Sequence, residues 1–180
     1  MPRKLTLVKQ VAFPSKSAVA TAFKAVNLAD AFAIQLPSDA SKNPDVLARF
    51  IFSVQPTWIG ALINVRDAIV AGFGLKTAKN LATLSSDPTA RRISIFRVFG
   101  TSATEVVIGE NDKHLDFRVS ILCTPPTPPN TDNQLTLSTV VHCHNRLGRT
   151  YLSVIAPFHR QVVKASLRRA AEVGWPKAST

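Results

Sequence analysis

HLDFRVSILC, residues 114–123, and QLTLSTVVHCH, residues 134–144, alternate apolar and polar side chains along almost their whole length. Because successive side chains of a β-strand point to opposite faces, this pattern predicts two strands that each place one face on a core. Between them lies TPPTPPNTDN, whose four prolines cannot donate the hydrogen bonds of a sheet. We therefore predict two neighbouring antiparallel strands joined by a loop.

Three more segments are predicted to be strands, at residues 91–99, 103–110 and 149–155. The proline loop makes one of the four connections between these five segments. The other three are short turn-like sequences, GTSA, ENDK and NRLG. Short connections of this kind join antiparallel neighbours, so the five segments predict a meander. Residues 31–36 add one more strand near the N-terminus.

Helix signals occur before and after these strands. Asn43, Pro44 and Asp45 supply a cap, a first-turn proline and a first-turn acid, and they predict a helix of about ten residues. Its expected apolar stripe is Val46, Leu47, Phe50 and Ile51. A second helix is predicted over residues 56–74, a third over residues 157–174, and a short one over residues 15–26.

This order of elements predicts the fold class. Strands followed by a long final helix indicate an α+β fold in which a curved antiparallel sheet wraps the C-terminal helix. A length of 180 residues favours a single domain. We expect a basic N-terminal segment over residues 1–27 that packs on a domain over residues 28–175, with a tail over residues 176–180.

Composition restricts the classes of protein. Hydrophobic residues make up 46% and charged residues 18%, which argues against disorder and coiled coil. Neither an export signal nor a membrane span is evident, and Cys123 and Cys143 are too few for a disulfide scaffold. We expect a cytoplasmic protein with two unpaired thiols, no metal and no cofactor.

Three stretches resemble, in order, an uncharacterised bacterial family of unknown function. They are PTWIGALINVRDAIVAGFGLK, EVVIGENDKHLDFRVS and LSTVVHCHNRLGRTYLSVIAPFHRQVVKASLRRA, and the resemblance covers roughly residues 25 to 172. Members of that family look like START-like domains, also called SRPBCC, polyketide cyclase-like or helix-grip domains. The resemblance implies the fold more than a function, because such folds host lipid carriers, hormone binders, cyclases and co-chaperones.

Polar side chains gather on one face of the predicted sheet. Alternation places His114, Asp116, Arg118 and Ser120 together on one strand, and the facing strands add His142, His144 and Arg149. The six charged or titratable members of this set could perform acid–base chemistry or hold an anion. The alternative, which we favour, is the solvated outer face of the sheet, because the apolar set should face the helix.

Three functions follow from these residues. The leading hypothesis is a binding module that holds a hydrophobic or amphipathic small molecule between the sheet and the C-terminal helix. Its candidate ligand-binding residues are Trp58, Leu62, Phe117, Leu137, Phe158 and Val162, which ordinary core packing explains equally well. One alternative is a cyclase- or isomerase-like enzyme that uses the polar set. Another is nonspecific nucleic-acid binding, because 22 Lys and Arg against 11 Asp and Glu give a net charge of +11.

Strand register provides a direct test. If the proline loop joins residues 123 and 134 as the ends of two paired strands, the numbers of two residues that lie opposite each other add up to about 256 to 258. His114 then lies opposite His142 or His144. A tight turn at NRLG would in addition place His144 opposite Arg149 and His142 opposite Tyr151.

Overall fold

A computed structural model describes residues 7–62, 91–125 and 133–178. Within these ranges, an antiparallel sheet of seven strands has the order β1-β2-β7-β6-β5-β4-β3. The strands are β1 Lys9–Gln10, β2 Leu28–Leu36, β3 Arg92–Ile93, β4 Phe96–Thr101, β5 Glu105–Asn111, β6 Leu115–Thr124 and β7 Asn133–Cys143. The helices are the 3-10 helix η1 Ala18–Thr21, α1 Pro44–Ser53 and α4 Arg146–Val173. Residues 57–62 are also helical.

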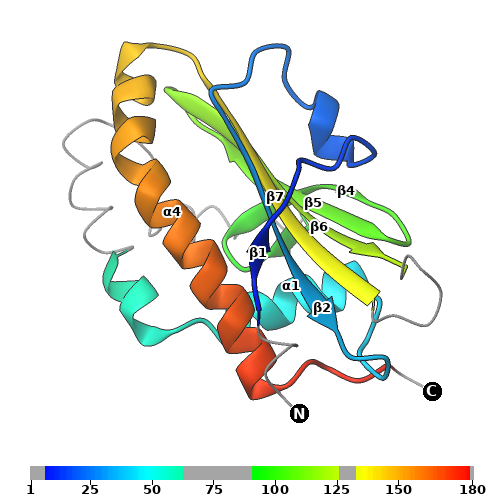
Figure 1. The fold of residues 1–180 in the computed structure, drawn as a ribbon. Coiled ribbons are helices and arrows are strands. Elements are labelled where there is room, and N and C mark those ends of the chain that lie inside the picture. Colours follow the sequence, from blue (N-terminus) through cyan, green and yellow to red (C-terminus); the bar gives the residue numbers. More distant parts are fainter. Residues whose placement is uncertain (1–6, 63–90, 126–132, 179–180) are drawn as a thin grey trace.

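The curved sheet wraps one side of α4, which crosses it diagonally (Figure 1). This arrangement confirms the predicted α+β class and is consistent with a helix grip. The meander is confirmed for the segments predicted at residues 103–110, 114–123 and 134–144, which form β5, β6 and β7. The single strand predicted over residues 91–99 is wrong, because a turn at residues 94–95 divides it into β3 and β4, which pair with each other. The predicted strand at residues 31–36 is β2, which starts earlier, at Leu28, and pairs with β7.

Register follows the prediction. β6 pairs with β7 so that Leu115 lies opposite Cys143, which places His114 opposite His144. The His144 backbone N–H donates to the His114 carbonyl over 2.9 Å. Cys123 and Cys143 lie at opposite ends of this hairpin, and both are unpaired as predicted.

The strand predicted over residues 149–155 is wrong, because this segment is the first part of α4. Asn145 caps the helix, and its side chain accepts a hydrogen bond from the Gly148 N–H over 2.9 Å. Pro157 lies inside α4 rather than at its start. The proline removes only the bond to the Ser153 carbonyl, and both residues lie on the exposed side of the helix.

Because residues 149–155 are helical, the predicted pairing of this segment with β7 does not occur. NRLG is not a hairpin turn, so Arg149 does not lie opposite His144, nor Tyr151 opposite His142. The residues that pack inward from the start of α4 are four apart, Gly148 and Leu152, as a helix requires.

The other helix predictions have mixed outcomes. α1 has the predicted start and length, with Leu47 and Ile51 buried, but Val46 is 40% exposed and does not belong to its apolar stripe. The helix predicted over residues 15–26 is reduced to η1. Of the helix predicted over residues 56–74, the part beyond residue 62 lies outside the described residues, with Val65, Ile69 and Phe73.

Three apolar clusters organise the interior. The largest lies between the sheet, α1 and the C-terminal half of α4, and includes Phe32, Leu137 and Leu167. A second cluster, around Val141 and Leu152, lies under the start of α4. The third lies on the opposite face of the sheet, where the N-terminal segment packs through Phe13, Val19 and Phe23 on Val107 and Val140.

Candidate functional site

A buried carboxylate lies beneath α4. Asp30 of β2 has a side chain that is 1% exposed, and its Oδ1 lies 3.4 Å from Nε2 of His159. Its Oδ2 lies 3.5 Å from Nε of Arg160. Thr139 of β7 is the residue directly opposite Asp30 in the sheet. We refer to Asp30, Thr139 and His159 as the polar centre.

Hydrogen bonding in the polar centre is incomplete. An N–H···O bond normally spans about 2.7 to 3.2 Å, so the contacts of Asp30 are electrostatic without satisfying its oxygens. Within the described part of the chain, both carboxylate oxygens, Thr139 Oγ1 and His159 Nε2 are buried without a hydrogen-bond partner. Leaving such a group unpaired costs about 1 to 3 kcal/mol. Four polar atoms without a hydrogen-bond partner therefore lie close together beneath α4.

The polar centre lies where two apolar clusters meet. On β2, Phe32 lies two residues after Asp30 and belongs to the largest cluster. Leu28 lies two residues before Asp30 and packs against the second cluster. On β7, Leu137 and Val141 flank Thr139 in the same way. Strand alternation therefore places one carboxylate and one hydroxyl between apolar residues of β2 and β7.

Apolar surface next to the polar centre is only partly covered. Val119 of β6 lies opposite Thr139, and Phe117 lies opposite Val141; both side chains are partly buried. The Phe117 ring meets that of Phe96 edge-on, with centroids 5.5 Å apart. This face can therefore contact an apolar group while the polar centre contacts a polar one.

The comparisons with known proteins place the chain in a family. A model described as "Protein of unknown function (DUF2867)" matches residues 22–166. The chain belongs to the DUF2867 family. No curated protein and no solved structure is significantly similar to it.

The predicted ligand-binding residues of this DUF2867 protein do not form one group. Leu137 is buried in the largest cluster, and Phe117 lies on the partly covered surface beside the polar centre. Leu62 and Val162 are partly buried. Trp58 and Phe158 are 43% and 51% exposed.

Most of the predicted polar set lies on the other face of the sheet, and the structure brings those residues together. His144 Nε2 lies 3.1 Å from Oδ1 of Asp116, and the rings of His142 and His144 meet edge-on, 5.1 Å apart. His114 is buried, and its Nδ1 accepts a hydrogen bond from the Asn145 side chain over 2.8 Å. Arg149 is separated from them on α4, where it is exposed.

This outer face is less solvated than the sequence indicates, because the N-terminal segment covers part of it. His142 donates from Nδ1 to the Ala25 carbonyl over 2.7 Å, and its ring stacks on Phe23. In the described ranges, no group of three or more His, Cys, Asp or Glu side chains is arranged to hold a metal ion.

Arg118, another member of the predicted polar set, contacts aromatic rings and backbone. Its guanidinium lies 3.5 Å from the ring centroid of Phe99 and 5.3 Å from that of Phe23, and it donates to the Phe117 carbonyl over 2.7 Å. Burial lowers the pKa of Arg118, an effect that the nearby carboxylate of Asp116 opposes. The arginine stays charged at neutral pH and joins the N-terminal segment to the sheet.

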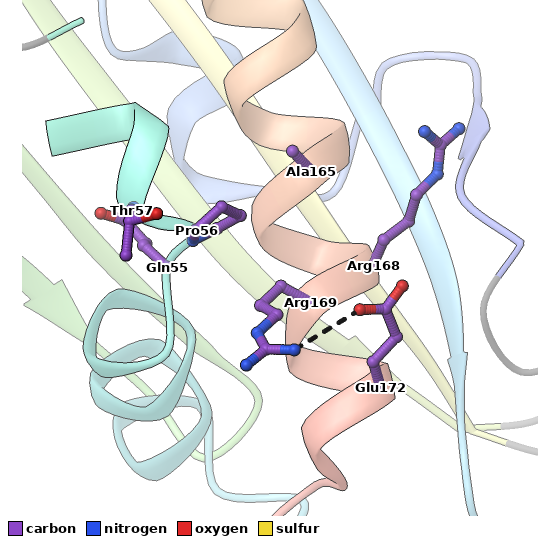
Figure 2. A pocket seen from close by; sticks show the side chains of 7 residues that line it. All are labelled: Gln55, Pro56, Thr57, Ala165, Arg168, Arg169 and Glu172. Carbon is purple, nitrogen blue, oxygen red and sulfur yellow. Dashed lines mark ion pairs between the residues drawn. The ribbon is translucent and has the colours of Figure 1, made fainter. Parts of the chain in front are cut away.

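Two open grooves lie elsewhere on the surface. One, of about 450 Å³, separates the start of the helix at residues 57–62 from the C-terminal half of α4; Figure 2 shows its lining, with the Arg169–Glu172 ion pair. The other, of about 390 Å³, lies at the start of α1 beside Arg91 and Thr101. Neither includes the polar centre.

Asp30, His159 and Arg160 were not among the candidate site residues predicted from the sequence. Asp30 precedes the apolar run of β2, and an acid at that position resembles the polar end of a strand. The available signal was the alternation itself, because Leu28, Asp30 and Phe32 share a face. His159 could be placed only after Pro157 was known to lie within the helix.

Proposed function

We propose that this protein binds an amphipathic small molecule between the sheet and α4, with the polar end of the molecule at the polar centre. The observation that carries the proposal is the buried Asp30 carboxylate, whose two oxygens accept no hydrogen bond from the described residues. A native interior seldom leaves such atoms without a hydrogen bond, and the contacts of Asp30 with His159 and Arg160, at 3.4 and 3.5 Å, do not supply one.

Chemistry of the polar centre favours a ligand with a hydroxyl or amine. Carboxylate oxygens accept hydrogen bonds, so the ligand group next to Asp30 must be a donor. Thr139 can donate or accept, and His159 can do either according to its tautomer. The partly covered Phe117 and Val119 supply contacts for an apolar body.

Mass spectrometry of an organic extract of the purified protein tests for a co-purified molecule of this class. A nitrobenzoxadiazole-labelled fatty alcohol, titrated by fluorescence, measures binding directly. Asp30→Asn should weaken binding of the labelled alcohol by at least about tenfold, because it replaces a charged acceptor. The fold of the variant is checked by circular dichroism.

Asp116→Asn is the matched control, since it makes the same change on the opposite face of the sheet. We expect it to bind the labelled alcohol as the wild type does. Binding lost in Asp116→Asn but kept in Asp30→Asn would contradict the proposal and move the site to the outer face. Failure of the wild-type protein both to bind the alcohol and to carry any co-purified molecule would also contradict it.

A second candidate function is acid–base catalysis at the same place. The approach of His159 Nε2 to Asp30 Oδ1 favours it, because a carboxylate beside an imidazole stabilises the imidazolium formed when histidine removes a proton. Incubation of the protein with its co-purified molecule distinguishes the two functions. Chemical conversion that His159→Gln abolishes supports catalysis, whereas recovery of the unchanged molecule supports binding alone.

A further inference from the structure

The outer side of α4 combines apolar and basic residues that are not packed against the sheet. Val154 and Phe158, one turn apart, are 55% and 51% exposed. Arg146 and Arg168 are also exposed. At about 100° per residue, Arg168, Val154 and Phe158 fall within about 80° of one another. Val154 and Phe158 therefore form a short apolar stripe, and Arg168 lies on the same side of the helix about 15 Å further along its axis.

Charge on α4 is mostly positive. Its sequence contains six Lys and Arg and a single acid, Glu172, which pairs with Arg169 over 3.8 Å. The whole chain carries a net charge of +11. An anionic surface therefore complements this side of the molecule.

A third exposed apolar side chain belongs to the neighbouring helix. Trp58 is 43% exposed and follows Thr57, which lines a groove together with Ala165 and Arg168 of α4 (Figure 2). Tryptophan is enriched at the boundary between lipid headgroups and acyl chains.

We propose that this side of α4 docks on a bilayer that contains anionic phospholipid. Arginines contact the headgroups, and Val154 and Phe158 enter the boundary with the acyl chains, as in helices that lie in the plane of a membrane. The exposed apolar stripe favours a bilayer over nucleic acid, because a phosphate backbone offers it nothing to bury against. In the described ranges, no helix is long and apolar enough to cross a membrane, so the docking is peripheral.

Co-sedimentation with vesicles tests the proposal on the full chain. We expect binding to phosphatidylcholine vesicles that contain about 30% phosphatidylglycerol, and little binding to pure phosphatidylcholine. Arg146→Gln with Arg168→Gln should weaken binding by about tenfold or more, and added salt should weaken it further. Val154→Ser with Phe158→Ser should have an effect of similar size, because it removes the buried apolar area.

Lys16→Gln with Lys24→Gln is the matched control, since it removes the same charge from exposed positions of the N-terminal segment. We expect this pair to bind vesicles as the wild type does. The proposal is overturned if anionic vesicles do not bind, if both double charge variants lose binding equally, or if the serine pair binds unchanged. Binding to a DNA oligonucleotide without binding to vesicles would also overturn it and assign the basic surface to nucleic acid.

Discussion

Ser17 and Glu105 are 88 residues apart in the chain, and the serine hydroxyl donates to the buried carboxylate over 2.5 Å. The same carboxylate accepts hydrogen bonds from the Ala18 N–H and from the Ser120 hydroxyl. Glu105 therefore joins the N-terminal segment to two strands of the outer face. The contact therefore anchors a segment that forms only one short helix, η1, against the sheet.

Glu105→Ala should destabilise the protein by about 3 kcal/mol, because three donors lose a charged acceptor inside the structure. Urea unfolding measures the change. Glu172→Ala, at an exposed position, is the control and should stay within about 0.5 kcal/mol of the wild type. Hydrogen exchange should show that residues 17–23 lose protection first in the Glu105 variant. An unchanged unfolding midpoint would show that this carboxylate does not anchor the segment.

Asn145 has two partners, the Gly148 N–H and the ring of His114. We predict that Asn145→Ala costs about 1 to 2 kcal/mol of stability, since it removes the cap of α4 as well as the donor to His114. Asn145→Asp keeps an acceptor for the helix N–H and should cost less. Thermal unfolding of both variants gives the comparison. Equal losses would mean that the cap contributes little.

Alternation in β6 and β7 was sufficient to predict their pairing and to restrict the partner of His114 to His142 or His144, because one buried face excludes a shift by one residue. The structure selects His144. The start of α4 was not predictable in this way. Residues 149–155 alternate well enough for a strand, and the competing signal, Asn145 as a helix cap, lies inside a sequence that also resembles a turn. Pro157 then indicated the start of a helix at a position that lies inside α4.

The polar centre was not predicted from the sequence, for a related reason. Titratable residues of β6 and β7 are visible in the sequence as a group, whereas Asp30, Thr139 and His159 come from three distant segments. Only the pairing of β2 with β7 and the path of α4 bring them together. Sequence periodicity shows which residues share a face of one element, but it does not show which face of another element lies against it.

Gly148 lies where α4 approaches the turn before β6. A Cβ at this position would meet the His114 carbonyl oxygen at 2.2 Å, a contact with backbone that cannot move aside cheaply. Gly148→Ala should therefore destabilise the protein by about 2 to 3 kcal/mol in spite of the better helix propensity of alanine. Gly60→Ala is the control, because nothing lies within 4 Å of its added carbon and the residue is helical. A stable Gly148→Ala protein would mean that α4 is not held this close to His114.

Cys123 provides a prediction of pH dependence. Burial raises its pKa from 9.0 to about 11, so the folded state holds the neutral thiol more tightly than the unfolded state does. The resulting stability is complete below pH 9.0 and is lost as the pH rises towards about 11. Cys123→Ala should therefore make the free energy of unfolding fall less steeply over that interval, which urea unfolding at several pH values measures.

Reactivity of the same thiol gives an independent measurement. At pH 8 the raised pKa makes the thiolate about a hundredfold rarer than at an unperturbed cysteine, so iodoacetamide should label Cys123 at least that much more slowly in the folded protein than in urea. Peptide mass spectrometry follows Cys123 and Cys143 separately. Burial raises the pKa of Cys143 as well, whereas nearby Arg149 lowers it, so Cys143 should react faster than Cys123. Rapid labelling of Cys123 in the folded protein would show that the end of β6 opens to solvent.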